Sequence, residues 1–100
     1  MTRKTWDEVK NGRADSEARR RGYERAGRTM RLAMEIHGLR EKRGLSQREL
    51  AEHLGTTQSA VARLEAGNVS PSLRTLDKIA EALGVELVVG FVDLDDRIAG

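Results

Sequence analysis

The side chains best suited to specific chemistry lie in a short polar stretch, residues 56–63. Gln58 can form two hydrogen bonds with the edge of an adenine base, and Arg63 can form two with a guanine. Ser59 lies beside Gln58 and can donate or accept one more hydrogen bond. Residues of these types are also common on any solvent-exposed helix face. Their significance therefore depends on the elements that position them.

Catalytic and metal chemistry find little support in the sequence. The chain has no cysteine, which excludes disulfides, thiolate ligands and cysteine nucleophiles. His37 and His53 have no partner at a spacing typical of metal ligands. No glycine-rich phosphate loop follows a strand, and no nucleophile is paired with a base. We expect no enzyme activity, no metal site and no cofactor.

The polar stretch lies inside a pattern typical of two helices joined by a tight turn. Ala51 is small, as is required where two helices approach closely. Gly55, four residues later, can adopt the positive φ that a tight turn demands. Val61 supplies an apolar contact from the second helix to the first. The pattern predicts helices over residues 46–54 and 58–66, the first of them opened by a capping box.

One further helix is expected on each side of this pair. Apolar residues at helical spacing predict a helix over residues 32–43 that ends before Gly44. Ser70 followed by Pro71 has the form of a helix start, which predicts a last helix over residues 71–83. Together the four helices would bury a small aliphatic core. The expected fold class is all-α.

The amino-terminal region is predicted to be helical in two pieces. Thr5 and Glu8 have the spacing of a capping box, so a short helix should begin there. The turn signal Asn11-Gly12 should end that helix. A second helical stretch is expected to begin at Asp15 or Ser16.

The formal net charge of +2 is unevenly distributed along the 100 residues. Residues 1–31 carry ten Lys or Arg against five Asp or Glu, which gives +5. Residues 32–82 carry seven of each, and residues 83–100 carry one against four, which gives −3. A basic arm can contact phosphate groups or an acidic protein surface, although surface charge also varies by chance. With no long apolar run and a polar start, we expect a cytoplasmic protein that does not enter membranes.

The last part of the chain is predicted to contain a strand, over residues 85–92, because β-forming residues are concentrated there. A single strand has unpaired edges, and the sequence offers no second strand except the same segment in another copy of the chain. We therefore expect a homodimer whose two strands pair across a two-fold axis. The dimer strand residues are Leu87, Val88, Val89 and Phe91. The alternative is an extended tail that folds back on its own helices.

Three stretches of the middle region, residues 44–51, 55–59 and 64–67, resemble the Cro/C1-type (Xre) helix-turn-helix family almost residue for residue. The resemblance extends over roughly residues 32–84. It implies a lambda-repressor-like helical bundle that binds DNA sequence-specifically, with the second motif helix in the major groove. By position, the implied base contacts are Thr57, Gln58, Ser59 and Arg63.

The same resemblance extends to phosphate contacts and to one ion pair. Gln47 matches a family position whose amide meets a phosphate, and backbone amides at helix starts serve the same purpose. Arg40 and Glu65 match a family ion pair that links the first helix to the recognition helix, and we treat this pair as structural. The expected phosphate contacts are Gln47, Arg48, Thr56, Asn68 and Arg74.

The two ends of the chain resemble HigA-type antitoxins of bacterial toxin–antitoxin pairs. The resemblance rests on the start at Trp6-Asp7-Glu8-Val9 and on the apolar segment after Leu83-Gly84. It implies a partner toxin, an mRNA-cleaving ribonuclease of RelE/HigB-like fold, bound through Trp6, Val9 and Tyr23. A neutralising segment for a basic toxin is expected to be acidic, whereas this arm is basic. Two roles for the arm therefore stay open: it can contact the toxin, or it can contact DNA beside the operator. For Trp6 the alternative to toxin contact is packing on its own domain.

We thus expect a basic helical arm in residues 1–31, a DNA-binding domain in residues 32–84, and a dimerising strand with an acidic tail in residues 85–100. The expected function is that of an antitoxin that binds a near-palindromic operator as a homodimer, represses its own operon and neutralises its toxin. One alternative is a stand-alone Xre-family repressor with no toxin partner. Another is an adaptor that uses the helical fold to bind proteins only.

Overall fold

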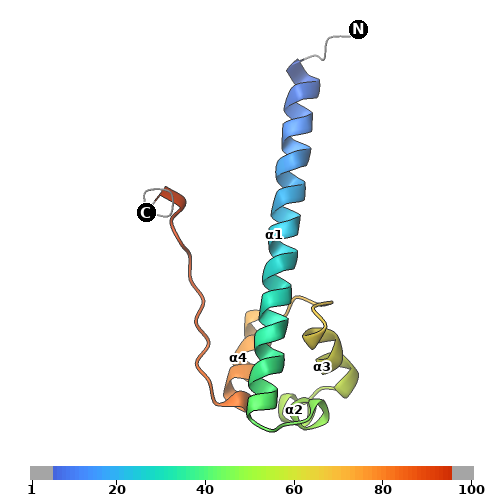
Figure 1. Cartoon of the computed structure of the whole chain (residues 1–100), viewed down its shortest axis with the longest axis vertical. Helices are drawn as coiled ribbons and strands as arrows, with labels where there is room; N and C mark the ends of the chain where they lie inside the picture. The colour runs from blue at the N-terminus through green and yellow to red at the C-terminus, as the bar shows by residue number, and fades with distance from the viewer. Residues whose placement is uncertain (1–5, 96–100) are drawn as a thin grey trace.

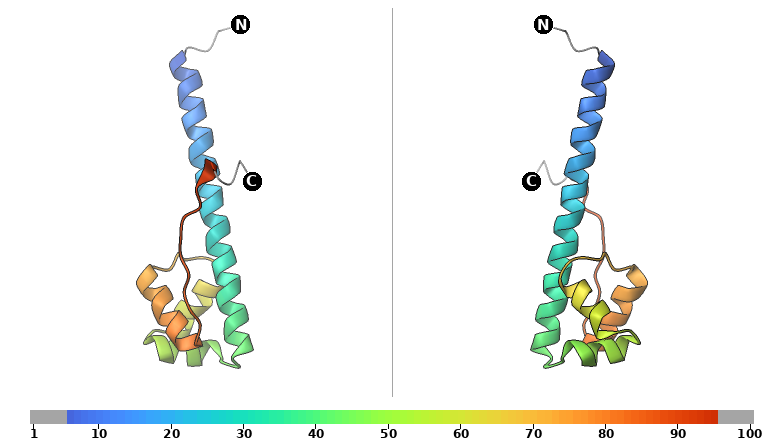
Figure 2. Two further views of the ribbon diagram at one scale, coloured as in Figure 1. Left: turned by 90° about the vertical axis from the view of Figure 1, so that its left-hand side faces the viewer. Right: turned by 90° about the vertical axis from the view of Figure 1, so that its right-hand side faces the viewer.

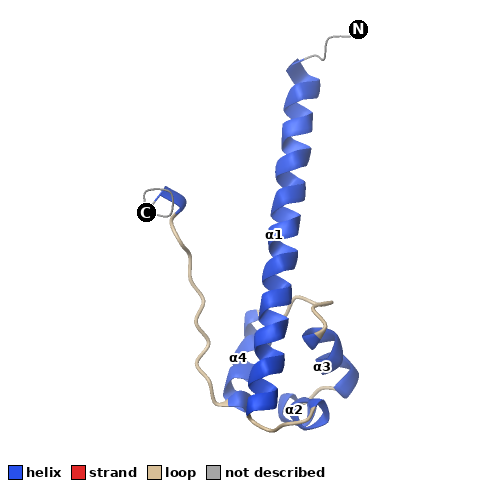
Figure 3. Ribbon diagram, in the orientation of Figure 1, coloured by secondary structure: helices blue, strands red, loops and turns tan. Residues whose placement is uncertain are grey.

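The computed structural model describes the backbone of residues 6–95, and its side chains from residue 16 onward. Four helices follow one another along the chain (Figure 1): α1 (Trp6–Lys42), α2 (Gln47–Leu54), α3 (Gln58–Glu65) and α4 (Leu73–Leu83). Within residues 6–95 no segment forms a strand, and apart from a short helical piece at Leu94 and Asp95 the rest is loop (Figure 3). The expected helical class is confirmed for this part of the chain. None of these helices combines the length and apolar character needed to cross a membrane.

Helix α1 is a single helix of 37 residues, about 55 Å long at 1.5 Å per residue. The predicted break at Asn11-Gly12 is wrong, because the helix passes through both residues. It also joins the arm to the helix expected over residues 32–43 without interruption. A glycine inside a helix costs only about 1 kcal/mol relative to alanine. The many Ala, Arg, Glu and Lys residues around the turn signal favour the helix enough to offset that cost.

The hydrophobic core lies at one end of the molecule, where the last part of α1 meets the other three helices (Figure 2). The remainder of α1 projects away from this bundle. Gly67, in the loop after α3, lies against α1 so closely that a Cβ atom there would be 2.8 Å from Met30 Cε. The buried core cluster consists of Ile36, Leu50, Ala51, Val61, Leu64, Leu76, Ile79 and Leu83.

The helix starts show where local sequence signals held and where they failed. The capping box at the start of α2 is confirmed, with Ser46 Oγ accepting from Glu49 N at 3.0 Å and Glu49 Oε1 accepting from Ser46 N at 3.1 Å. The predicted start of α4 at Ser70-Pro71 is wrong. Ser72 caps the helix instead, its Oγ accepting from Thr75 N at 3.1 Å. A serine with a hydrogen-bonding partner three residues later is the stronger start signal.

Residues 85–93, beyond α4, are extended but form no strand, so the predicted β-strand is not seen in the single chain. Val85 and Leu87 are half-buried against the core, as the fold-back alternative expects, whereas Val88, Val89 and Phe91 are exposed. A strand requires a hydrogen-bonded neighbour. In the part of the chain that is described, the backbone of residues 86–92 has no hydrogen-bonding partner. The segment is therefore a drawn-out stretch of chain without strand pairing (Figure 1).

Gly55→Ala tests the turn between α2 and α3, and Gly38→Ala in α1 is its control. Gly55→Ala should lower the free energy of unfolding by about 1–2 kcal/mol, because Gly55 has a φ of 67° and an L-residue is strained there. Gly38→Ala should raise it by about 0.5–1 kcal/mol, because Gly38 lies inside α1 with nothing within 4 Å of the added Cβ. Urea denaturation of both variants measures the two effects. Equal effects of the same sign would contradict the left-handed turn at Gly55.

Candidate nucleic-acid interface

Helices α2 and α3 are joined by a three-residue turn that fixes the direction of α3. Ala51 is 3% exposed, and its carbonyl accepts a hydrogen bond from Thr56 N at 2.9 Å, which closes the end of α2. Val61 is 1% exposed and Leu64 is 6% exposed, so one side of α3 is buried in the core. The turn pattern read from Ala51, Gly55 and Val61 is thus confirmed.

The opposite side of α3 is polar and faces solvent. Gln58, Ser59 and Arg63 are all exposed, and all three belong to the same eight-residue helix. Thr57 precedes them as the N-cap residue, with its Oγ1 accepting from Ala60 N at 3.1 Å. Four hydrogen-bonding side chains therefore lie along the start and outer face of α3. The arrangement presents hydrogen-bond donors and acceptors to a macromolecular partner.

A buried cluster of polar side chains ties the end of α3 to α1. Arg40 Nε donates to Glu65 Oε2 at 2.7 Å and Arg40 Nη2 donates to Glu65 Oε1 at 3.0 Å, a two-pronged ion pair. The side chains of Arg40 and Glu65 are only 10% and 3% exposed. Arg40 Nη1 also donates to the carbonyl of Leu45 at 2.7 Å, which adds the α1–α2 loop to the cluster.

Two more side chains complete this cluster around Glu65. His37 Nδ1 lies 2.7 Å from Glu65 Oε1, and His37 Nε2 lies 3.1 Å from Glu41 Oε1. Gln47 Nε2, at the start of α2, donates to Glu65 Oε1 at 3.4 Å. Helices α1 and α2 therefore both contribute partners to one carboxylate of α3. We refer to His37, Arg40, Gln47 and Glu65 as the Glu65 cluster.

The electrostatics of the cluster favour a charged Glu65. Burial by itself raises the pKa of Glu65, but hydrogen bonds from Arg40, His37 and Gln47 outweigh burial and hold the pKa below its ordinary value. For Arg40, the hydrogen bond to Glu65 raises the guanidinium pKa, although burial opposes that rise. Both groups are charged at neutral pH, and each compensates the other.

The remaining predicted contact residues lie around α3 in different states. Arg48 is exposed, with its Nε 3.7 Å from Glu52 Oε1. Thr56, Asn68 and Arg74 are exposed on the turn, on the loop after α3 and on the first turn of α4. Gln47 is half-buried because its amide is drawn towards Glu65.

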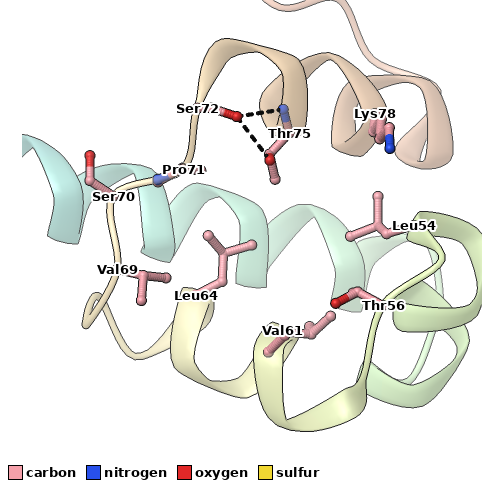
Figure 4. A pocket seen from close by; sticks show the side chains of 11 residues that line it. Leu54, Thr56, Val61, Leu64, Val69, Ser70, Pro71, Ser72, Thr75 and Lys78 are labelled. Atoms are coloured by element: carbon pink, nitrogen blue, oxygen red, sulfur yellow. Dashed lines mark hydrogen bonds between the residues drawn. The ribbon is translucent and has the colours of Figure 1, made fainter.

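A groove of about 390 Å³ separates α3 from the start of α4 (Figure 4). Val61, Leu64 and Val69 give it apolar walls. Thr56 lies at one side of the groove, and Ser72 with its capping partner Thr75 lies at the other. The α2–α3 turn and the capped start of α4 therefore border the same groove, on one side of the bundle.

His37 is the residue of this region that the sequence reading missed. The sequence shows no partner for it at metal-ligand spacing, but in the structure it contacts Glu41 and Glu65 and lies 3.2 Å from Arg40 Nη2. Its spacing of three and four residues from Arg40 and Glu41 on one helix was the available signal. The contact with Glu65 comes from a different helix, so no local spacing predicts it. Trp6 and Val9 lie on α1, but their side chains are outside the described residues.

Glu65→Gln tests the energetics of the Glu65 cluster. The variant should lose about 3 kcal/mol of unfolding free energy at pH 7, because it leaves the Arg40 charge buried without its counter-charge. The pKa of Glu65 is lowered on folding, so its contribution is fully present above the ordinary glutamate pKa of about 4.3 and is lost as the pH falls through the folded value. Urea denaturation at several pH values should show the wild-type advantage shrinking in acid.

Glu41→Gln is the matched control, since Glu41 also contacts His37 but its side chain is 63% exposed. It should change the unfolding free energy by no more than about 0.5 kcal/mol. If Glu65→Gln were as mild as Glu41→Gln at pH 7, the cluster would not hold α3.

A family model described as Helix-turn-helix (HTH_3) matches residues 36–89 of the chain. The match begins inside α1 and spans α2, α3, α4 and the start of the extended segment. It therefore contains the turn, the outer face of α3 and the whole Glu65 cluster described above.

Two relatives are HTH-type transcriptional regulators. One, from Methanothermobacter thermautotrophicus, is 42% identical over 67 residues, which is 67% of this chain and 94% of the relative. The other, from Sinorhizobium fredii, is 36% identical over 64 residues, 64% of this chain. The chain spans only 33% of the length of that second relative.

The fold also matches a solved structure, the restriction-modification controller protein C.AhdI from Aeromonas hydrophila. The TM-score is 0.59 with 33% identity, and the match covers 61% of this chain and 88% of the controller protein. The expected Cro/C1-type fold of the middle region is thereby supported together with its family. The chain belongs to the Helix-turn-helix family.

Proposed function

We propose that the outer face of α3 enters the major groove of a near-palindromic operator. The observation that carries this proposal is the exposed polar face of α3 on a helix whose other side is buried and whose end is fixed by the Glu65 cluster. Gln58 is suited to a bidentate contact with adenine and Arg63 to one with guanine. Thr57 and Ser59 add hydrogen bonds to bases next to these.

Phosphate contacts position this helix on the duplex. We assign them to exposed residues on both sides of α3, together with the amide groups at the start of α2. Gln47 can take part only if its amide serves a phosphate as well as Glu65, from which it lies 3.4 Å away. The assigned residues are Gln47, Arg48, Thr56, Asn68 and Arg74.

A homodimer doubles these contacts. The helix-turn-helix region carries no net charge, so nonspecific attraction to DNA contributes little there and specific contacts must carry the affinity. Pairing of Leu87, Val88, Val89 and Phe91 from two copies would place two α3 helices on half-sites about 34 Å apart. Exposure of Val88, Val89 and Phe91 in the single chain supports this pairing.

We propose further that the protein is a HigA-type antitoxin, which represses its own operon in the cytoplasm and neutralises a RelE/HigB-like toxin. The supporting observation is the projecting part of α1, which is mostly exposed and holds Tyr23 at 84% exposure. A helix of this kind gains stability chiefly by packing on a partner. In this proposal residues 1–31 bind the toxin, with Trp6, Val9 and Tyr23 as apolar anchors.

The second candidate is a stand-alone repressor without a toxin. The likeness to regulators and to a controller protein is equally compatible with it. In that case the basic residues of the projecting helix contact DNA beside the operator. An adaptor that binds only proteins would have no use for the polar outer face of α3.

Replacing Gln58 and Arg63 by alanine tests the proposed groove contacts. Each change should weaken binding to the promoter of the protein's own gene by roughly 1–3 kcal/mol, and together they should abolish detectable specific binding. Fluorescence anisotropy with the promoter fragment measures the affinity. Circular dichroism should show an unchanged fold, because both side chains are exposed.

Lys78→Ala provides the control, since Lys78 is an exposed cation on α4 to which no contact is assigned. If Lys78→Ala and Arg63→Ala lose the same operator affinity, the loss in Arg63→Ala comes from the removal of a positive charge and not from a specific base contact. Affinity that survives in the double variant would refute the groove assignment.

Co-expression with the product of the neighbouring gene tests the antitoxin role. A complex should form, and growth arrested by that product should be restored by the full chain. Tyr23→Asp should weaken both effects while leaving operator binding intact, because Tyr23 is 84% exposed and precedes Ala33, the first buried residue of the described part of α1, by ten residues. If no complex forms and growth is not restored, the stand-alone repressor is the correct function.

A further inference from the structure

A basic hollow of about 530 Å³ lies on the projecting part of α1. Three arginines against one glutamate give its α1 lining a net charge of +2. In the described part of the chain, none of these arginines forms an ion pair. We call this surface the arginine hollow. Its lining residues from α1 are Arg20, Tyr23, Glu24, Gly27, Arg28 and Arg31.

One residue from the carboxyl-terminal part of the chain, Leu94, also lines the arginine hollow. The extended segment after α4 runs in the direction of the projecting part of α1, which brings Leu94 level with it (Figures 1 and 2). Asp93 Oδ1 accepts a hydrogen bond from Asp95 N at 2.9 Å, which caps the short helical piece at this point. Two carboxylates therefore flank the tail residue that lines the hollow.

The tail and the arm carry opposite charges. Residues 83–100 have a net charge of −3, whereas residues 1–31 have one of +5. Exposed charges attract each other only weakly in water, so a free acidic peptide would not remain on α1. The tail is joined to α1 through the bundle, and such a connection gives it a high effective concentration at the hollow. A weak attraction is then enough to hold it there.

The chemistry of the arginine hollow suits this occupant. Arginine side chains offer aliphatic stems for packing while their charged heads stay in water. A leucine between two aspartates matches that order, with an apolar group in the centre and a carboxylate on each side. Leu94 is still 65% exposed, so the contact is shallow and a competing anion can displace the tail.

We propose that the acidic tail covers the arginine hollow and competes there with the phosphates of nucleic acids. This inference goes beyond the proposed function, because it requires neither an operator read by α3 nor a toxin. A DNA duplex carries one charge about every 1.7 Å along its axis, so uncovered arginines attract DNA of any sequence. The tail opposes that attraction and leaves the side chains of α3 untouched. It therefore lowers nonspecific binding more than operator binding.

Binding of the full-length protein to a duplex of unrelated sequence tests this proposal, with fluorescence anisotropy as the measurement. Asp93→Asn with Asp95→Asn removes two tail charges and keeps a side-chain oxygen for the cap. This double change should tighten binding about three- to tenfold at about 0.05 M salt, because DNA no longer has to displace a charged tail. The gain should disappear at about 0.5 M salt, where exposed charges are screened.

Two further variants separate a covered hollow from a change in net charge. Glu81→Gln with Glu86→Gln also removes two exposed carboxylates, but neither residue lines the arginine hollow. It should tighten binding much less. In a chain that carries Arg20→Gln, Arg28→Gln and Arg31→Gln, the change at Asp93 and Asp95 should have no effect, because the tail then has no cations to cover.

An equal gain from the two pairs of carboxylate changes would overturn the proposal. A gain from the tail change that persists without the three arginines would do the same. If neither the wild type nor the tail variant binds the duplex at low salt, the proposal also fails, because the hollow then attracts no phosphate. These outcomes are independent of operator reading by α3, since the duplex has an unrelated sequence.

Discussion

The buried ion pair between Arg40 and Glu65 is the interaction on which the geometry of this protein depends. It joins α1 to the end of α3, and His37 and Gln47 bring α1 and α2 to the same carboxylate. A buried ion pair adds little net stability, because desolvation offsets most of its attraction. What it adds here is direction. The donors meet the two oxygens of one carboxylate, and this geometry favours the orientation that α3 has on the bundle.

In that orientation the two sides of α3 have different roles. Val61 and Leu64 hold the inner side of α3 in the core, and the outer side is left free for Gln58, Ser59 and Arg63. In the proposed function, the neutral charge of the helix-turn-helix region fits this division, because recognition of DNA would then depend on placed hydrogen bonds more than on bulk attraction to phosphate. The strongly charged parts of the chain lie outside it, in the arm and in the tail.

Much of the fold could be predicted from sequence where a backbone conformation demands a residue type. Gly55 was identified because only a residue without Cβ adopts a φ of 67° without strain, and Ser46 with Glu49 because their capping contacts are local. The turn expected at Asn11-Gly12 and the helix start at Ser70-Pro71 failed, since such local signals are weak against longer helical stretches and better caps. The strand expected over residues 85–92 does not form, because the described part of the chain offers the backbone of residues 86–92 no hydrogen-bonding neighbour. Within the site, the contacts of His37 and Gln47 with Glu65 were not predicted, because they join residues from different helices.

The central claim is that α3, held by the Glu65 cluster, is the element that reads DNA. The most direct measurement is an NMR titration of the full-length protein with the promoter fragment of its own gene, followed through the backbone amides. The account predicts that the largest shift changes fall on residues 57–63 and on the start of α2, with small changes in the buried core. Changes confined to the projecting part of α1, with α3 unaffected, would contradict it.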